Sequence, residues 1–260
     1  MKVVILCGGK GTRLREETEY KPKPLVLIGG KPILWHIMKI YSHYGYNDFI
    51  LCLGYKADMI KDYFLRLHES VNDFTLDFNY PKPKTIIHGK NHDKNWKITF
   101  VDTGLETEKG GRIAQIKKYI TDQDFFLTYG DGVGDLDIKK LYRLHKTNNK
   151  IVTVTGVRLS MFGGRLEIKD DTVKAFEEKP TLRKEWLNGG FFVCNKKIFD
   201  YLSEDKSCVF EEDVLPQLAK EGQMSVYKHN DFWYTMNTYK ESEELNKMWN
   251  SGKAAWKIWK

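Results

Sequence analysis

The amino-acid sequence predicts an α/β protein built on a doubly wound, mostly parallel sheet, and three observations support this fold class. Over the first 65 residues, apolar strand-like runs alternate with segments of helical periodicity, a pattern typical of parallel strands joined by right-handed crossovers. A glycine-rich turn directly follows the first apolar run. Between about residues 70 and 102, short segments punctuated by prolines indicate a small antiparallel excursion.

The N-terminal part contains two strand–helix units. A continuous apolar run over Lys2–Cys7, β-branched at its start, is typical of a strand that is buried on both faces. Apolar residues at helical spacing predict a helix over Lys31–Tyr44, in which Pro32 suits the first turn. A second strand is expected over Asn47–Leu53 and a second helix over Lys56–Leu67.

The antiparallel excursion is expected to hold three short strands, and the alternation of helices and strands then resumes. The three strands are predicted over Thr75–Asn79, Thr85–His88 and Lys97–Val101. After them we expect a helix over Arg112–Ile120, a strand over Asp124–Thr128, a helix over Ile138–Thr147 and a strand over Ile151–Gly156.

The C-terminal third shows weaker patterns. Short mixed strands are expected over Arg165–Asn195, and from Phe210 onward the chain reads as mostly helical, interrupted by a strand over Met224–His229. We expect residues 1–220 to form the main domain and residues 221–260 to pack on it as a helical C-terminal segment. No clear linker separates the two.

Composition excludes several classes of protein. The longest apolar runs, Val3–Cys7 and Phe49–Leu53, are far shorter than the roughly 18 residues that a membrane span needs. The N-terminus also lacks the long apolar stretch and cleavage region of a signal peptide. The four cysteines form no C-x-x-C pair, and zinc-site spacing is absent. A reduced, cytoplasmic protein is the simplest interpretation.

The net charge favours anionic small molecules as ligands. The chain has 42 lysines and arginines against 35 aspartates and glutamates, a formal net charge of +7. The basic residues are spread among acidic ones and form no stripe with interleaved aromatic residues, so nucleic-acid binding is not expected. His36 and His43 lie on an expected helix and are interpreted as structural.

The turn after the first strand is the most informative segment. It reads Gly8-Gly9-Lys10-Gly11-Thr12-Arg13, and its backbone N–H groups can form an anion-binding nest. The glycine spacing matches neither a dinucleotide-binding fingerprint nor a P-loop. Arg13 adds a bidentate donor for a phosphate. Lys23 follows between two prolines, which restrict where its ammonium group can point.

With these residues the sequence resembles the sugar-phosphate nucleotidyltransferases, whose opening motif is G-G-x-G-T-R-L followed by K-P-K-P. Within that family it is most similar to the glucose-1-phosphate cytidylyltransferases. The resemblance spans nearly the whole chain in order. Further matching segments are Lys31–Met38, Gly54–Lys56, Val101–Gly104, Gly110–Arg112, Thr128–Gly132, Glu177–Pro180, Asn188–Phe192 and Ser251–Trp259.

The resemblance implies a Rossmann-like, GT-A-like fold and an Mg²⁺-dependent enzyme that joins CTP to glucose 1-phosphate. The products would be CDP-glucose and pyrophosphate, formed by direct displacement without a covalent intermediate. Residues 1–220 would bind both substrates and carry the catalysis. The resemblance also implies a homo-oligomer that serves polysaccharide synthesis, in a capsule or lipopolysaccharide.

The resemblance implies roles for individual residues. Arg13 would hold the β- and γ-phosphates of CTP, Lys23 the α-phosphate and Lys179 the acceptor phosphate, whereas Asp131 and Asn237 would hold the metal. The remaining CTP-binding positions would be Leu6, Gly8, Gly9, Gly11, Thr12, Thr103, Gly110, Gly111 and Arg112, and the remaining acceptor-binding positions Tyr129, Gly164, Glu178, Asn188 and Gly189.

Two departures from the family pattern leave alternatives open. The second metal aspartate of the family is replaced in Met236-Asn237-Thr238, which removes one negative charge. The segment Phe162-Gly163-Gly164-Arg165 lacks the Arg and Phe that usually flank the acceptor-site glycine. A CTP-dependent enzyme with another acceptor, such as a different sugar phosphate or an amino-acid phosphate like glutamine phosphate, is the first alternative. A nucleotide-binding relative without activity is the second.

Overall fold

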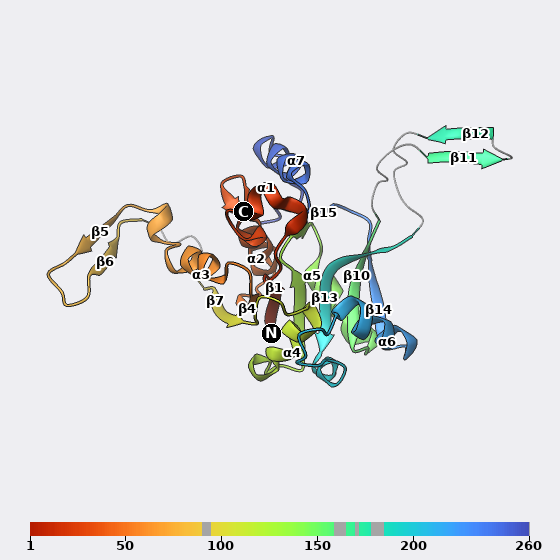
Figure 1. Ribbon diagram of the computed structural model, residues 1–260, viewed down its shortest axis with the longest axis horizontal. Helices are drawn as coiled ribbons and strands as arrows, with labels where there is room; N and C mark the ends of the chain where they lie inside the picture. The colour runs from red at the N-terminus through yellow and green to blue at the C-terminus, as the bar shows by residue number, and fades with distance from the viewer. Residues whose placement is uncertain (90–94, 159–164, 170–171, 178–184, 260) are drawn as a thin grey trace.

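The computed structural model confirms the predicted α/β class (Figure 1). It describes residues 1–89, 95–158, 165–169, 172–177 and 185–259. A seven-stranded central sheet has the strand order β14-β10-β13-β8-β1-β4-β7. Its strands are β1 (Lys2–Leu6), β4 (Asp48–Leu53), β7 (Lys97–Asp102), β8 (Asp124–Tyr129), β10 (Val152–Val157), β13 (Leu187–Asn195) and β14 (Met224–His229). Only β13 runs antiparallel to its neighbours, so the sheet is mostly parallel.

Helices cover both faces of this sheet, so the fold is doubly wound. The α-helices of the described residues are α1 (Arg15–Thr18), α2 (Ile33–His43), α3 (Ala57–Leu65), α4 (Lys109–Gln115), α5 (Ile138–Asn148), α6 (Leu215–Lys220) and α7 (Tyr239–Asn250). Val3 and Ile5 of β1 belong to the apolar core that includes α2, α5 and α7. Val4 and Leu6 belong to the opposite core, with α4 and α6. Burial on both faces explains why β1 is continuously apolar.

In the part of the chain that the structure describes, four two-stranded antiparallel sheets lie outside the central one. They pair β2 (Leu27–Ile28) with β3 (Lys31–Pro32), β5 (Phe74–Asp77) with β6 (Lys84–Ile87), β9 (Gly132–Gly134) with β15 (Trp233–Thr235), and β11 (Arg165–Lys169) with β12 (Thr172–Glu177). The β5–β6 hairpin extends away from the body of the molecule (Figure 1). Among the described residues, no helix is both long and apolar enough to cross a membrane.

Two sequence predictions were wrong in their details. β7 was expected in the antiparallel excursion, but it is a parallel edge strand of the central sheet, in register with β4 from Asp48↔Lys97 to Leu53↔Asp102. The helix expected over Arg112–Ile120 begins earlier, at Lys109, and ends at Gln115. Its first turn contains Gly110 and Gly111, which allow close packing: a Cβ on Gly110 would lie 2.5 Å from Cys208 Sγ.

The C-terminal segment contributes to both the sheet and the core. β14 pairs in parallel with β10, and β15 and α7 follow it, whereas residues 251–259 are irregular rather than helical as expected. Trp256 is fully buried and its ring packs against His36, Trp249 and Phe232. His36 is therefore structural, as predicted, and its Nε2 atom lies 2.8 Å from the Ile28 carbonyl oxygen.

Candidate active site

A cleft of about 710 Å³ opens where the central strands end. Its floor is formed by Leu6 at the end of β1 and by Tyr129 and Asp131 at the end of β8. Because β13 runs antiparallel to β8, its first residues reach the same edge of the sheet. The other lining residues include Gly8–Arg13, Lys23, Leu105–Lys109, Arg112, Asn188–Phe191, Glu211, Trp233, Thr235 and Asn237. The carboxyl ends of parallel strands are the usual ligand site of open α/β sheets.

The glycine-rich turn forms one wall of this cleft, as the sequence suggested. Gly11 has a φ of 66°, and a Cβ there would lie 2.8 Å from Thr18 Cγ2, so the turn requires glycine. Thr12 begins a short 3₁₀ turn, Thr12–Leu14, and Arg13 is exposed on it. No described residue forms an ion pair with Arg13 that would compete with an anionic ligand.

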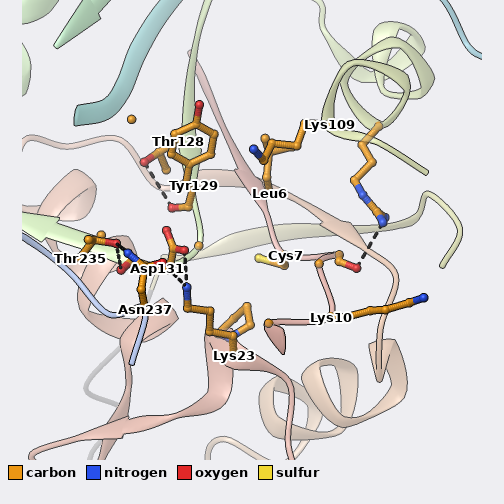
Figure 2. Close-up of a pocket in the computed structure, with 18 of the residues that line it drawn as sticks. Leu6, Cys7, Lys10, Lys23, Lys109, Thr128, Tyr129, Asp131, Thr235 and Asn237 are labelled. Atoms are coloured by element: carbon orange, nitrogen blue, oxygen red, sulfur yellow. Dashed lines mark hydrogen bonds and ion pairs between the residues drawn. The ribbon is translucent and has the colours of Figure 1, made fainter. Parts of the chain in front are cut away.

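Lys23 lies at the bottom of the cleft between Asp131 and Asn237 (Figure 2). Its Nζ atom donates to Asp131 Oδ2 at 2.6 Å and to Asn237 Oδ1 at 3.0 Å. The Pro22–Lys23 junction starts a 3₁₀ turn that leaves Lys23 only 9% exposed. Asn237 reaches Asp131 because β15 pairs with β9 and the Met236 N–H donates to the Asp131 carbonyl oxygen. Three residues that the sequence assigned to catalysis and metal binding therefore meet at one point.

Cys7 also lines the cleft, but it is not poised as a nucleophile. The residue is buried, and burial raises the pKa of its thiol well above the usual range. The thiol therefore stays protonated at neutral pH. This agrees with a reaction that needs no covalent intermediate.

Arg112 is buried behind the glycine-rich turn, and its guanidinium group acts as a structural hub. It donates to Thr103 Oγ1 at 2.7 Å and to four backbone carbonyl oxygens, those of Gly8, Leu53, Gly104 and Leu105, at 2.7–3.2 Å. A Cβ on Gly8 would lie 2.1 Å from Arg112 Nη1, so the turn rests directly on the guanidinium plane. The arginine thus fixes the turn to the segment that follows β7.

Three residues that were predicted to bind CTP lie behind the cleft wall. Thr103 is 1% exposed and donates to the Leu53 carbonyl oxygen at 2.6 Å. Gly110 and Gly111 are buried within α4, against Cys208 and the Asp205 carbonyl oxygen. The structure therefore brings Leu6, Gly8, Gly9, Gly11, Thr12, Arg13, Lys23 and Arg112 to the cleft, but not these three.

The expected acceptor side is built around Tyr129. Asn188 Nδ2 donates to the Tyr129 hydroxyl oxygen at 3.1 Å, and the Gly189 carbonyl oxygen accepts from Trp233 Nε1 at 2.8 Å. Gly190 has a φ of 77°, and a Cβ there would lie 2.4 Å from the Tyr129 ring. Gly164, Glu178 and Lys179, which were also assigned to the acceptor and to catalysis, lie outside the described residues.

Sequence reasoning missed two charged residues in this part of the cleft. Glu211 Oε1 accepts from the Tyr129 hydroxyl at 2.7 Å and from Lys109 Nζ at 2.6 Å. Burial, reinforced by the Glu211 carboxylate, raises the pKa of Tyr129 well above its usual range, so the phenol remains a donor. Neither Lys109 nor Glu211 falls in a motif, and only the acidic run at 211–213 before an apolar segment marked the position.

Known proteins similar to this chain identify its family. The nucleotidyl transferase family profile matches residues 2–251. The chain is 49% identical to the probable glucose-1-phosphate cytidylyltransferase of Bacillus subtilis (strain 168), over the full length of both chains. It is 44% identical to the glucose-1-phosphate cytidylyltransferase of Salmonella typhimurium, again over the full length of both.

A solved structure shares this fold. The crystal structure of HddC from Yersinia pseudotuberculosis superposes with a TM-score of 0.70 at 27% identity, covering 95% of this chain and 99% of that one. The resemblance inferred from the sequence motifs is thereby confirmed. The glycine-rich turn, the Lys23–Asp131–Asn237 group and the full-length matches lead to one conclusion: the chain belongs to the nucleotidyl transferase family.

Proposed function

We propose that the chain is a cytidylyltransferase that joins CTP to glucose 1-phosphate and gives CDP-glucose and pyrophosphate. The observation that carries this proposal is the full-length identity of 44–49% to glucose-1-phosphate cytidylyltransferases. In the reaction, a phosphate oxygen of the acceptor attacks the α-phosphorus of CTP. The bond from that phosphorus to the oxygen bridging the β-phosphate breaks, and pyrophosphate leaves with the bond electrons.

The described side chains support a mechanism of positioning and charge neutralisation. The reaction brings four phosphate groups together, so cationic and N–H donors aimed at them lower the barrier. The glycine-rich turn and Arg13 would hold the β- and γ-phosphates at the mouth of the cleft. Lys23 would exchange its present partners for the α-phosphate, where negative charge builds up. Lys179, outside the described residues, would hold the acceptor phosphate.

The cleft also fits a divalent metal ion, which we propose is Mg²⁺. The carboxylate of Asp131 and the amide oxygen of Asn237 both lie within hydrogen-bonding distance of one atom, Lys23 Nζ, so the two oxygens converge. Mg²⁺ prefers a few protein oxygens together with phosphate oxygens. Bound by Asp131 and Asn237, it would supply charge neutralisation for the phosphates.

The decisive experiment measures pyrophosphate release from CTP and Mg²⁺ with glucose 1-phosphate, in parallel with other sugar phosphates and amino-acid phosphates. We expect glucose 1-phosphate to give a kcat/KM above about 10⁴ M⁻¹ s⁻¹, which is an ordinary value for enzymes. Turnover only with another acceptor would overturn the assignment of glucose 1-phosphate and keep the cytidylyl chemistry. CTP binding without turnover of any acceptor would identify a nucleotide-binding relative instead.

We also propose a cytoplasmic setting, self-association and a role in polysaccharide synthesis. All four cysteines are buried and unpaired, which suits a reducing compartment. The β5–β6 hairpin exposes Phe74, Leu76 and Phe78, and an isolated two-stranded hairpin is only marginally stable; a second copy covering it would account for both facts. A nucleotide-activated sugar is the form that glycan-building enzymes consume. Light scattering of the purified protein tests the self-association, and a monomer would contradict it.

A further inference from the structure

Glu211 carries a hydrogen-bonding capacity that the proposed mechanism does not use. Both of its described donors, Tyr129 Oη and Lys109 Nζ, meet the same oxygen, Oε1. No described residue donates to Oε2. The Glu211 side chain is 27% exposed and lines the cleft, so a bound molecule can reach this second oxygen. One carboxylate oxygen is therefore held by the protein while the other is open to a ligand.

The backbone around Glu211 is built to hold it in place. Phe210–Val214 forms a π-helical turn, an uncommon geometry that is frequent at functional sites. Phe210 and Val214 anchor the turn in the apolar core, at 0% and 1% exposure. The Asp213 carboxylate accepts from the Val209 N–H at 2.6 Å and closes the start of the turn. Glu211 thus projects into the cleft from a rigid support.

A carboxylate in a cleft that must bind phosphates needs an explanation, because it would repel them. The ion pair with Lys109 cancels the net charge, so the pair remains compatible with anionic substrates. Lysine and arginine side chains, including Lys10, Arg13 and Lys23, supply donors to the cleft but no acceptors. A carboxylate can accept hydrogen bonds from hydroxyl groups, which are the other polar groups of a sugar phosphate or of a ribose.

We infer that Glu211, held by Lys109 and Tyr129, is a specificity-determining residue that accepts a hydrogen bond from a sugar hydroxyl of a substrate. This inference rests on the proposed function. The hydroxyl belongs either to the acceptor sugar or to the ribose of CTP. The acceptor sugar is favoured, because Asn188 and Tyr129, two expected acceptor-binding residues, are hydrogen-bonded to each other beside Glu211. A site built to bind a hydroxyl rejects an analogue that lacks it, because the buried acceptor is left unpaired.

The test compares Glu211→Gln with Glu212→Gln in the full-length protein. Glu212 is the next residue, is exposed and does not line the cleft, so it is a matched control. Steady-state kinetics are measured with glucose 1-phosphate against its monodeoxy analogues, and with CTP against 2′-deoxy-CTP and 3′-deoxy-CTP. Thermal unfolding of both variants confirms that they fold.

We expect Glu211→Gln to raise the KM of one substrate by about 10- to 100-fold, the loss typical of a hydrogen bond to a charged group. The wild-type preference for the hydroxylated substrate over one deoxy analogue should shrink by a similar factor, whereas Glu212→Gln should change neither. A change confined to glucose 1-phosphate identifies the acceptor sugar, and a change confined to CTP identifies the ribose.

Two outcomes separate failure of the inference from failure of the proposed function. The inference is overturned if folded Glu211→Gln prefers each hydroxylated substrate over its deoxy analogue as strongly as the wild type does, even if kcat falls. A carboxylate that only supports the fold would leave this preference unchanged. If the wild type does not turn over glucose 1-phosphate, the proposed function has failed instead. The wild type and Glu211→Gln are then compared by calorimetric binding of CTP and its deoxy analogues. If the substitution lowers the affinity for all of these nucleotides equally, the inference is overturned.

Discussion

Lys23 allows a direct test of the proposed metal site, because its ammonium group lies where the side-chain oxygens of Asp131 and Asn237 converge. In Lys23→Met, the side chain keeps much of its length and apolar body but loses the charge. Asp131 Oδ2 and Asn237 Oδ1 then lose the donor that they share at 2.6 and 3.0 Å. A divalent cation that takes these oxygens no longer has to displace an ammonium group.

The size of the effect follows from that contact. A hydrogen bond to a charged group contributes about 1.5–3 kcal/mol net, and each 1.4 kcal/mol is a factor of ten in affinity. The Asp131 side chain is 28% exposed, so solvent screening favours the lower end of this range. We therefore expect Lys23→Met to bind a divalent cation about tenfold more tightly than the wild type when no nucleotide is present.

The turnover rate of Lys23→Met should fall, although its affinity for a divalent cation should rise. Without Lys23, the charge that develops at the α-phosphate loses a preorganised donor, an effect of about 100-fold or more on kcat. CTP affinity should stay nearly constant, because the glycine-rich turn and Arg13 remain. Tighter cation binding combined with slower turnover is a signature that simple damage to the fold does not produce.

The assay titrates Mn²⁺ against the apo-protein and follows the free ion by electron paramagnetic resonance, with CTP binding measured by calorimetry. Lys21→Met is the matched control, since Lys21 pairs with Glu17 on the surface just upstream. Unchanged Mn²⁺ affinity in Lys23→Met would show that the ammonium group and the cation occupy different places. Retention of most of the turnover would refute the role given to Lys23.

Three further predictions concern the supports of the site. Arg112→Met removes the guanidinium donors of the Gly104 and Leu105 carbonyl oxygens and one donor each of the Gly8 and Leu53 carbonyl oxygens, so it should lower the urea-measured free energy of unfolding by about 3–5 kcal/mol; a loss below about 1 kcal/mol would contradict the structural role of Arg112. Burial lowers the pKa of His36 to about 4 from 6.5, so folding favours the neutral ring and its contribution is complete above pH 6.5 and is lost as the pH falls toward 4. Urea unfolding across this pH window should show that the free energy of unfolding falls by about 3 kcal/mol, a loss that is absent in His36→Asn. An equal dependence of this free energy on pH in the two proteins would contradict the prediction. Gly190→Ala, at φ 77° and against the Tyr129 ring, should reduce kcat/KM at least tenfold in an otherwise folded protein, whereas Gly222→Ala, at φ 65° in open space, should not; equal activities would show that the Tyr129 wall tolerates movement.

Much of the fold is predictable because its strands are buried on both faces. β1 and β4 read as continuous apolar runs, and such runs are hard to place anywhere but inside a parallel sheet. β7 was misplaced for the complementary reason. It lies at the edge of the sheet, and five of its six residues are half-buried or exposed, so its sequence resembles that of a half-solvated antiparallel strand.

The predictable part of the site is the part that a local pattern encodes. Glycines directly after one strand and an aspartate directly after another predict a phosphate site, because such a site depends on the backbone geometry at strand ends. Glu211 and Lys109 are separated by 102 positions and meet only through tertiary packing. Arg112 shows a third case: it was predicted to line the site, and it does, but the sequence does not reveal that its buried guanidinium donates to backbone carbonyl oxygens.

Asn237 changes the net charge of the Lys23–Asp131–Asn237 group, which we propose holds a divalent cation. Lys23, Asp131 and Asn237 together carry no net charge, whereas an aspartate at position 237 would leave one negative charge there. A neutral group attracts a free cation weakly, and it also repels an incoming triphosphate less. The triphosphate itself carries most of the negative charge that a divalent cation needs. In the proposed mechanism Asp131 and Asn237 would hold the divalent cation together with the triphosphate, which would supply most of the negative charge, and Lys23 would turn to the α-phosphate.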